Sequence, residues 1–411
     1  MKKIAIVGGG AAGMLAALYA ARAGARVCLL ERNEKLGKKV YITGKGRCNA
    51  TNACERDEFF RNIPRNPRFL YAAFSKLDNI GMIDLLESLG CPMKVERGER
   101  AFPVSDKASD VTGALSRELR RLGVEVRFET RVRELIIEDG SAKGVVLENG
   151  QRISADAVIV ATGGLSYPST GSTGDGYRLA EAAGHTVIPA RAGLVPIETE
   201  EKWCADLTGL SLKNVRLSAN VKGGKRFYSD MGEMLFTHFG VSGPLVLSMS
   251  SMIPENGQVQ LEIDLKPALD AATLDKRLLR DFAEMQNRQI ATVMDGLAPH
   301  SLALMLLQLA DISPYMPVHS VTSEQRKSLV KLMKGIPLTV KGTRSMDEAI
   351  ITRGGINVKE VNPSTMQSRL VSGLYFAGET LDIDAMTGGF NLQIAFSTGA
   401  LAGESAAKEE N

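Results

Sequence analysis

The chain has few cysteines and histidines, and neither set has the spacing of a metal site. Its five cysteines are Cys28, Cys48, Cys54, Cys91 and Cys204. They include no C-x-x-C pair and their number is odd, which disfavours a zinc site and a disulfide framework and predicts reduced thiols. The four histidines, His185, His238, His300 and His319, share no ligand spacing, so we expect no metal.

The chain also lacks a charge excess and a long uninterrupted apolar run. Fifty basic residues against 47 acidic ones give a net charge of +3, which is no argument for nucleic acid or a membrane surface as partner. No apolar run is long enough for a transmembrane helix, and we expect a cytoplasmic protein. With 411 residues and 44% hydrophobic content, two or three domains are expected.

The first thirty residues carry the clearest motif. An apolar run, Ile4 to Val7, leads into G-x-G-x-x-G at Gly8, Gly10 and Gly13, and a second apolar run ends at Glu31. In a strand–turn–helix unit these glycines allow a tight turn, close approach to a pyrophosphate and close packing of the helix. The acid accepts hydrogen bonds from a ribose. One alternative is a glycine-rich turn that binds no ligand. The other is a signal peptide, against which the three consecutive glycines and the arginines that follow argue.

A basic loop follows at residues 32–52 and contains several glycines. A solvated face has the same composition, but the position directly after a phosphate-binding unit favours a loop that wraps a dinucleotide. Lys38, Lys39 and Arg47 are candidates to neutralise phosphate or flavin charge. Asn49, Thr51 and Asn52 offer hydrogen bonds to a polar ring edge.

The pattern then alternates between helix and strand. Residues 55–92 read as helical with short breaks, and Val111, Leu115 and Leu119 have helical spacing. Residues 124–156 alternate as an antiparallel ribbon with turns at Asp139-Gly140 and Asn149-Gly150. A buried strand at 157–161 ends at Thr162-Gly163-Gly164, and a polar loop with a short helix follows at 165–185. We therefore expect a parallel sheet with an antiparallel ribbon as its crossover.

The middle of the chain changes character from about residue 192. Strand-like segments at 193–198, 215–222, 225–229 and 259–265 flank an expected loop at 233–251. Helical patterns follow at 273–296, 300–310 and 323–334, and residues 337–340 are strand-like. We predict an inserted cap or substrate domain over 192–343, with a β part at 192–266 and 336–343 and a helical part at 267–335.

The end of the chain returns to the first domain. Residues 370–379 read as a strand ending at Gly378-Glu379, and Gly388-Gly389 precede a helix that begins near Phe390. We predict an α/β fold, namely a Rossmann-like FAD-binding domain built from residues 1–191 and 344–411 and interrupted by the insertion. The helix near Phe390 is expected to point its N–H groups at the flavin N1/C2=O edge, an ordinary glycine-rich helix start being the alternative.

These segments resemble the BaiN-like NAD(P)/FAD-dependent oxidoreductases, a group that includes aminoacetone-oxidase-type FAD-binding enzymes. The resemblance spans essentially the whole chain and rests on VGGGAAG at 7–13, TGKGRCNATN at 43–52, ATGGLSYPSTGSTGDGY at 161–177, LFTHFGVSGP at 235–244, TRGGINVKEVNP at 352–363 and GLYFAGETLDIDAMTGGFNLQIAFSTG at 373–399. It implies FAD as cofactor and, for the namesake enzyme, activity on conjugated ketones of the bile-acid type. Lys45 departs from the small residue expected there.

On these patterns and this resemblance we name the expected site residues. The FAD-contacting set is Gly8, Gly10, Ala11, Ala12, Gly13, Glu31, Arg32, Lys38, Lys39, Gly46, Arg47, Cys48, Asn49, Val132, Ala161, Thr162, Gly163, Gly378, Glu379, Gly388, Gly389, Phe390, Asn391 and Leu392. Val132 is included as a main-chain contact to the adenine, by analogy with flavoproteins that have two dinucleotide-binding domains. Candidate catalytic donors are Arg47, Tyr167 and His238, with Ser166 beside them. Each of these residues also has a purely structural alternative. Tyr167, before Pro168, could anchor a turn, His238 could be a structural histidine, and Cys48 could be a small buried residue.

Three functions remain open. The first is hydride transfer from NAD(P)H through flavin N5 to an electron-poor C=C or enone in a small molecule such as a 3-oxo steroid. Because the sequence holds one dinucleotide fingerprint, the nicotinamide would have to leave before the substrate enters. The second is an amine or amino-ketone oxidase that uses O2. The third is an RNA-associated flavoprotein, for which Lys327, Lys331 and Lys334 form a basic stripe. No Ser/His/Asp arrangement is recognised, and the oligomeric state is open.

Overall fold

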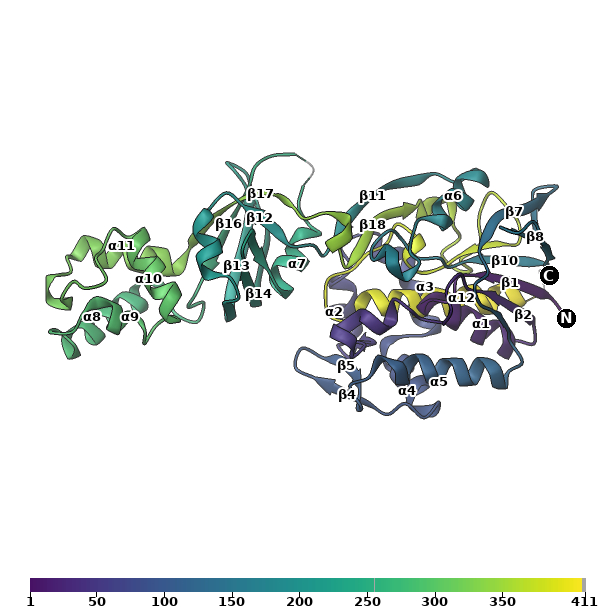
Figure 1. Cartoon of the computed structure of the whole chain (residues 1–411), viewed down its shortest axis with the longest axis horizontal. Coiled ribbons are helices and arrows are strands. Elements are labelled where there is room, and N and C mark those ends of the chain that lie inside the picture. Colours follow the sequence, from purple (N-terminus) through teal and green to yellow (C-terminus); the bar gives the residue numbers. More distant parts are fainter. Residues whose placement is uncertain (255, 409–411) are drawn as a thin grey trace. The chain divides into compact units, whose positions relative to one another are not determined.

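The computed structural model describes residues 1–254 and 256–408 of the chain. It divides into two compact units, one made of residues 1–193 and 346–411 and the other of residues 194–345. We name the first unit 1 and the second unit 2 (Figure 1). Within the described residues, no helix combines the length and the apolar character needed to cross a bilayer.

The core of unit 1 is a five-stranded parallel sheet in the order β19-β10-β1-β2-β6. Its strands are β1 (Lys3–Val7), β2 (Arg26–Leu30), β6 (Glu125–Arg127), β10 (Ala157–Val160) and β19 (Leu374–Phe376). β1, β10 and β19 are apolar runs that are buried almost throughout, as expected for the middle of a parallel sheet. The predicted Rossmann-type sheet is confirmed.

Helices surround this sheet, and unit 1 also contains a separate small β-sheet. The helices are α1 (Ala11–Arg22), α2 (Arg56–Arg61), α3 (Tyr71–Lys76), α4 (Asn79–Ser88), α5 (Ala108–Arg121), α6 (Asp175–Ala182) and α12 (Phe390–Ala407). Short 3-10 turns lie at Val40–Gly46 (η1), Pro67–Leu70 (η2), Pro168–Thr170 (η3), Met346–Glu348 (η6), Val358–Glu360 (η7) and Gly378–Thr380 (η8). A three-stranded sheet joins β3 (Thr51–Asn52), β5 (Arg100–Pro103) and β4 (Met93–Glu96).

The predicted antiparallel crossover is also present. β7 (Val132–Glu138), β8 (Ser141–Leu147) and β9 (Arg152–Ser154) form a meander between β6 and β10. Asp139 and Gly140 both have positive φ, 48° and 72°, as a two-residue hairpin turn of this handedness requires. A separate two-stranded ribbon pairs β11 (Val187–Gly193) with β18 (Ile351–Ile356).

Helices α1 and α12 lie side by side in unit 1 (Figure 1). A Cβ atom on Gly399 of α12 would lie 2.2 Å from the carbonyl oxygen of Ala12, and one on Gly403 would lie 2.1 Å from that of Ala16. Only glycine permits such an approach of two helix backbones. The last helix of the chain is therefore fixed directly against the first.

Unit 2 is a closed β-barrel with a helical extension. Its strands are β12 (Ile197–Thr199), β13 (Ser211–Val221), β14 (Arg226–Thr237), β15 (Gly240–Ser242), β16 (Val259–Asp264) and β17 (Ile336–Thr343), paired in the order β12-β15-β14-β13-β16-β17. Between β16 and β17 lie α8 (Ala271–Glu284), α9 (Ile290–Met294), α10 (His300–Leu309) and α11 (Ser323–Lys334). Short turns lie at Lys202–Leu207 (η4) and Val318–Ser320 (η5), and barrel and helices share one apolar core.

Two of the expected local structures were wrong. The loop expected at 233–251 consists of the end of β14, a tight turn, β15 and the helix α7 (Pro244–Ser250), because Gly240 and Gly243 have positive φ and turn the chain within a few residues. The strand expected at 370–379 is shorter. Of the described residues in that range, Leu374–Phe376 form the ladder with β10, opposite Val158 to Val160, and the strand β19 is limited to these three.

Candidate functional site

The first strand, turn and helix build an anion cradle. Gly8 has a φ of +102°, and a Cβ there would lie 2.6 Å from the carbonyl oxygen of Ala161. A Cβ on Gly13 would lie 1.8 Å from the carbonyl oxygen of Gly8, so helix and turn touch. By contrast, among the described residues outside the adjoining backbone, no atom lies within 4 Å of a Cβ built on Gly10. Gly10 is the N-cap of α1 and has no side chain that could accept a hydrogen bond from the helix N–H groups. The first N–H groups of α1, including those of Ala11 and Ala12, have no acceptor within the helix and suit a pyrophosphate.

Glu31 stands at the end of β2 and is 6% exposed. Its Oε2 accepts a hydrogen bond from the backbone N–H of Gly9 at 2.7 Å. Its Oε1 accepts from the backbone N–H and the side-chain amide of Asn33, at 2.8 and 2.7 Å. The carboxylate is thereby held at the edge of the glycine turn, and its remaining lone pairs suit ribose hydroxyl donors.

Three of the basic residues that follow contact other groups within unit 1. Arg32 donates to Thr173 Oγ1 at 2.6 Å and to Asp175 at 3.2 Å. Burial acts to raise the pKa of Asp175, but Arg131 and Arg32 outweigh it and the pKa is lowered. Lys38 Nζ lies 3.3 Å from Glu34 Oε2. Lys39 Nζ donates to Ser166 Oγ and to Glu379 Oε2, both at 2.6 Å.

Glu379 is the centre of a polar network at the carboxyl ends of the strands. Its Oε1 accepts from the backbone N–H of Thr352 at 2.8 Å and from Ser166 Oγ at 3.1 Å. Thr352 Oγ1 in turn accepts from the backbone N–H groups of Leu165 and Ser166, at 2.7 and 3.0 Å. The network joins the loop after β10, the strand β18 and the turn η8, which are far apart in the sequence. Thr352 was missed by sequence reasoning, although TRGGIN was recognised as a motif.

The loop at residues 43–52 is compact and partly strained. Gly44, Lys45, Gly46 and Cys48 all have positive φ, and the Cys48 thiol is buried, which raises its pKa to about 12. A thiol with such a pKa is not a nucleophile at neutral pH. Asn52 Nδ2 donates to the carbonyl oxygen of Gly388 at 3.0 Å and so links this loop to the start of α12.

The N-terminus of α12 faces the same loop. Gly388 and Gly389 have φ values of 129° and 103°, and a Cβ on Gly389 would lie 2.5 Å from the backbone of Thr51. Asn391 Oδ1 accepts from the N–H of Ala385 at 2.9 Å, and its amide donates back to the Ala385 carbonyl at 2.8 Å. Phe390 packs edge-on against Phe59, with ring centroids 5.1 Å apart. The side chains of Phe390 and Asn391 therefore hold the helix start, while its backbone N–H groups suit a flavin edge.

Three buried polar atoms near these elements have no hydrogen-bond partner among residues 1–254 and 256–408: Asn49 Oδ1, Thr51 Oγ1 and Thr162 Oγ1. Buried polar atoms are normally paired, so such a group near a glycine cradle indicates a ligand. Together with the open space at Gly10 and the helix starts of α1 and α12, they fit a dinucleotide that carries a flavin. Of the other expected contacts, Ala161, Thr162 and Gly163 follow β10, Val132 begins β7, Gly378 begins η8, and Leu392 lies in the first turn of α12.

The three expected catalytic donors lie in different surroundings. Arg47 is bound to Glu96 and Asp106 and stacks 4.1 Å from the ring centroid of Phe102. Tyr167 has a φ of +53° directly before Pro168, and the Lys39 ammonium lies 6.0 Å from its ring centroid. His238 belongs to unit 2, where its ring contacts Phe239. Their catalytic roles stay predictions.

A serine, a histidine and a glutamate do line up in unit 1, which sequence reasoning did not recognise. His185 Nε2 lies 2.8 Å from Ser368 Oγ, and His185 Nδ1 lies 3.4 Å from Glu360 Oε2. However, Ser368 Oγ also accepts from the N–H groups of Leu370 and Val371, and the residue is 7% exposed. A hydroxyl that is buried and already accepts two hydrogen bonds is part of a turn, so this arrangement holds the chain and is not a hydrolytic site.

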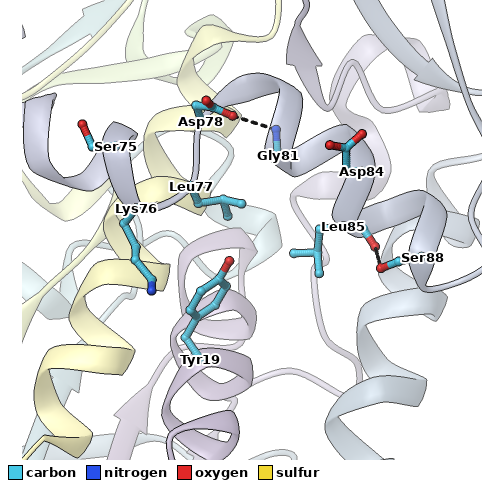
Figure 2. A pocket seen from close by; sticks show the side chains of 9 residues that line it. All are labelled: Tyr19, Ser75, Lys76, Leu77, Asp78, Gly81, Asp84, Leu85 and Ser88. Atoms are coloured by element: carbon cyan, nitrogen blue, oxygen red, sulfur yellow. Dashed lines mark hydrogen bonds between the residues drawn. The ribbon is translucent and has the colours of Figure 1, made fainter.

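An open cleft of about 460 Å³ lies between α1, α3 and α4 in unit 1 (Figure 2). Figure 2 shows the Tyr19 ring between the side chains of Lys76 and Leu85. Its polar groups serve the helices themselves: Asp78 accepts from the N–H of Gly81 at 2.7 Å, and Ser88 Oγ donates to the Leu85 carbonyl at 2.7 Å. Tyr19 stands near the C-terminal end of α1, away from the glycine cradle at its start. This cleft is therefore separate from the dinucleotide site.

The parallel sheet, the glycine cradle and the second helix start at α12 define a Rossmann-type FAD-binding oxidoreductase. A profile described as "HI0933-like protein Rossmann domain" matches residues 2–405, and the chain belongs to this family.

Named relatives cover nearly the whole chain. It is 36% identical over 426 residues to a 3-dehydro-bile acid delta(4,6)-reductase of Clostridium scindens, covering 99% of this chain and 100% of the relative. It is 31% identical over 394 residues to a ribosomal RNA dihydrouridine synthase of Escherichia coli, covering 96% and 95%. A 3-ketosteroid-Δ4-(5α)-dehydrogenase of Rhodococcus jostii RHA1 shares the fold, with a TM-score of 0.52, 16% identity and coverage of 99% and 97%.

Proposed function

We propose that the chain is an FAD-dependent reductase that transfers a hydride, taken from NAD(P)H, to a C=C bond conjugated with a carbonyl. The observation that carries this proposal is the chemistry common to the two kinds of relative. One name denotes reduction of Δ4,6 double bonds in a 3-oxo bile acid, and the other denotes formation of dihydrouridine, a uridine with a saturated ring C=C bond. In both cases the reduced bond is conjugated with a ring carbonyl.

The residues of unit 1 have distinct roles in this proposal. Bound FAD supplies the hydride-carrying centre. The start of α1 and Gly10 hold the pyrophosphate, and Glu31 accepts from the ribose. The start of α12, at Gly389 and Phe390, orients its N–H groups toward the pyrimidine edge of the flavin.

The reductant enters and leaves the same site in this scheme. The sequence contains one G-x-G-x-x-G fingerprint, which the FAD adenosine half takes, so the nicotinamide nucleotide has no Rossmann unit of its own. We therefore expect ping-pong kinetics, with NAD(P)⁺ leaving before the acceptor binds. The kinetic signature is a set of parallel double-reciprocal plots.

The test separates the two half-reactions. The purified protein with FAD is mixed anaerobically with NADH or NADPH, and bleaching of the flavin absorbance is followed. The reduced protein is then offered a 3-oxo-Δ4 steroid, a simple enone, an amino-ketone couple or air. Rapid bleaching and reoxidation by an enone are the expected result. Bleaching by an amine with hydrogen peroxide formation, and indifference to nicotinamides, would establish the oxidase instead.

A second candidate acceptor is uridine in RNA, which the Escherichia coli relative named for ribosomal RNA favours. The basic stripe proposed for it on α11 is incomplete. Lys327 and Lys331 are exposed, but Lys334 Nζ binds Asp264 at 2.7 Å and the Lys266 carbonyl at 2.9 Å. Incubation of the reduced protein with unmodified ribosomal RNA, followed by mass spectrometry of nucleosides, would reveal dihydrouridine if this candidate holds.

A further inference from the structure

A loop of unit 1 leaves the glycine cradle and folds back to it. The loop comprises residues 165–174, between β10 and α6, and we call it the strap. The chain leaves β10 at Ala161, whose carbonyl oxygen would lie 2.6 Å from a Cβ on Gly8. Within the strap, Ser172 is buried, and its Oγ would lie 2.8 Å from a Cβ on Gly163. The strap therefore begins near the cradle and returns to the same end of β10.

Asn33 joins the strap to the carboxylate of Glu31. Its Nδ2 donates to Glu31 Oε1 at 2.7 Å and to the carbonyl oxygen of Thr170 at 3.0 Å. A Cβ on Gly171, the next residue of the strap, would lie 2.7 Å from the same nitrogen. The middle of the strap thus lies one side chain away from the carboxylate that suits the ribose.

Arg32 fastens the strap a few residues further along the chain. Its Nη1 donates to Thr173 Oγ1 at 2.6 Å, to Asp175 Oδ2 at 3.2 Å and to the Gly171 carbonyl oxygen at 3.5 Å. Asp175 is also held by Arg131, which binds its two oxygens at 3.1 and 2.9 Å. Hydrogen bonds to a charged group are stronger than those between neutral groups. Arg32 therefore ties the strap to a carboxylate that is already fixed.

The beginning of the strap has an attachment of its own. Ser166 is fully buried, and its Oγ accepts from Lys39 Nζ at 2.6 Å and donates to Glu379 Oε1 at 3.1 Å. Pro168 and Ser169, between the two attachments, are exposed. Both attachments consist of protein groups alone, so they hold the strap closed with or without a cofactor.

We propose that the strap closes the adenosine end of the FAD site, that Arg32 and Asn33 latch it, and that FAD enters and leaves only when this latch opens. The inference rests on the FAD site and not on the acceptor proposed for the enzyme. Loops that cover a bound molecule commonly open and close in this way and limit its exchange.

A latch has a kinetic signature that differs from that of a cofactor contact. A weakened latch destabilises the closed state by the same amount with and without FAD and leaves the open state unchanged. Entry and release should therefore become faster by the same factor, and the equilibrium dissociation constant should stay the same. Loss of a group that touches FAD would instead raise the release rate and the dissociation constant together.

The experiment measures entry and release of FAD separately. The FAD-free protein is mixed with an increasing excess of FAD by stopped flow, and the flavin fluorescence is followed. In the wild type the observed rate should level off at high FAD concentration, because opening of the latch becomes rate-limiting. Release is measured on the protein with bound FAD by displacement with an excess of 5-deaza-FAD, whose absorbance differs from that of FAD.

Two variants weaken the latch at different points. Thr173→Val removes one acceptor of Arg32, at an exposed position of the strap, and should raise the limiting entry rate and the release rate about threefold to tenfold. Arg32→Gln removes the guanidinium from all three acceptors and should raise both rates by at least about tenfold. Arg369→Gln, at an exposed arginine of the same unit, is the control and should match the wild type in both rates.

The outcomes separate the inference from the cofactor assignment. A wild type that does not bind FAD would refute the FAD site itself. If the wild type binds FAD and its entry rate rises in proportion to FAD concentration without levelling off, the inference is refuted. Unchanged rates in both latch variants would refute it as well. So would a raised dissociation constant with an unchanged limiting entry rate, which would show that Arg32 contacts FAD. Thr173→Val keeps the test valid should Arg32→Gln fail to fold.

Discussion

A single glycine provides the sharpest test of cofactor binding. A Cβ on Gly10 would meet no protein atom within 4 Å, so Gly10→Ala should leave the free energy of unfolding of the FAD-free protein within about 0.5 kcal/mol. The added methyl group would occupy the space expected for the pyrophosphate, so FAD affinity should fall at least about tenfold, a factor worth about 1.4 kcal/mol. Urea unfolding of the FAD-free protein measures the free energy of unfolding, and titration of the FAD-free protein with FAD measures the affinity.

Gly342→Ala is the matched control, since that glycine also has open space around it but lies in the barrel of unit 2. It should change neither measurement. Equal FAD affinity in Gly10→Ala and the wild type would show that the cofactor does not approach this turn.

At the scale of elements, the contact between α1 and α12 should be intolerant of any side chain. Gly403→Ala would place a methyl group 2.1 Å from the Ala16 carbonyl oxygen and force the helices apart. We expect a loss of about 2–4 kcal/mol in the free energy of unfolding, measured by chemical denaturation. The same substitution at Gly113 of α5 meets only the flexible end of Arg117 and should stabilise the protein by up to about 1 kcal/mol. If both variants lowered the free energy of unfolding, or both raised it, the close contact between α1 and α12 would be contradicted.

The junction of α1 and α5 predicts a pH dependence. Arg121 and Arg22 bind Glu118 at 2.7 and 2.9 Å and lower its pKa to about 2, although burial acts to raise it. Because the folded pKa lies below the unfolded one, this stabilisation is complete above about pH 4.5 and is lost as the pH falls toward 2. Glu118→Gln should therefore cost about 1–2 kcal/mol at pH 7 and progressively less below pH 4. Thermal unfolding of the variant and the wild type between pH 2 and pH 7 measures this difference in stability. Glu134→Gln, which removes an exposed carboxylate, is the control, and its difference from the wild type should not change with pH in this way.

The strands and the glycine turn of unit 1 could be predicted from the sequence, whereas contacts between distant segments could not. The apolar runs Ile4 to Val7 and 157–161, each followed by glycines, predict strands of a parallel sheet, and these predictions are confirmed. The closure of the barrel was not predictable, because β12 pairs with β17 through residues as distant as Ile197 and Thr343. Two ion pairs could not be predicted for the same reason, because each joins residues that are far apart in the sequence: Lys39 with Glu379, and Arg65 with Asp384. No local spacing in the sequence indicates which charges meet.

At the scale of the molecule, the two units have separate apolar cores, with no residue in common. We therefore expect calorimetry to show two transitions, of which only that of unit 1 rises in temperature when FAD is added. Leu338 on β17 is 1% exposed, and Leu338→Ala should destabilise unit 2 by about 2–5 kcal/mol. Its effect should be confined to the transition that FAD does not shift. A single transition that responds to both changes would show that the units unfold as one.

The contact between Gly399, Gly403 and the backbone of α1 also bears on how the protein is made. Synthesis proceeds from the first residue to the last, so α1 leaves the ribosome long before the segment that covers it. Until α12 arrives, the small apolar side chains along α1 are open to water and to other nascent chains. The growing polypeptide is therefore expected to depend on chaperones over most of its translation, and to acquire its cofactor only after release.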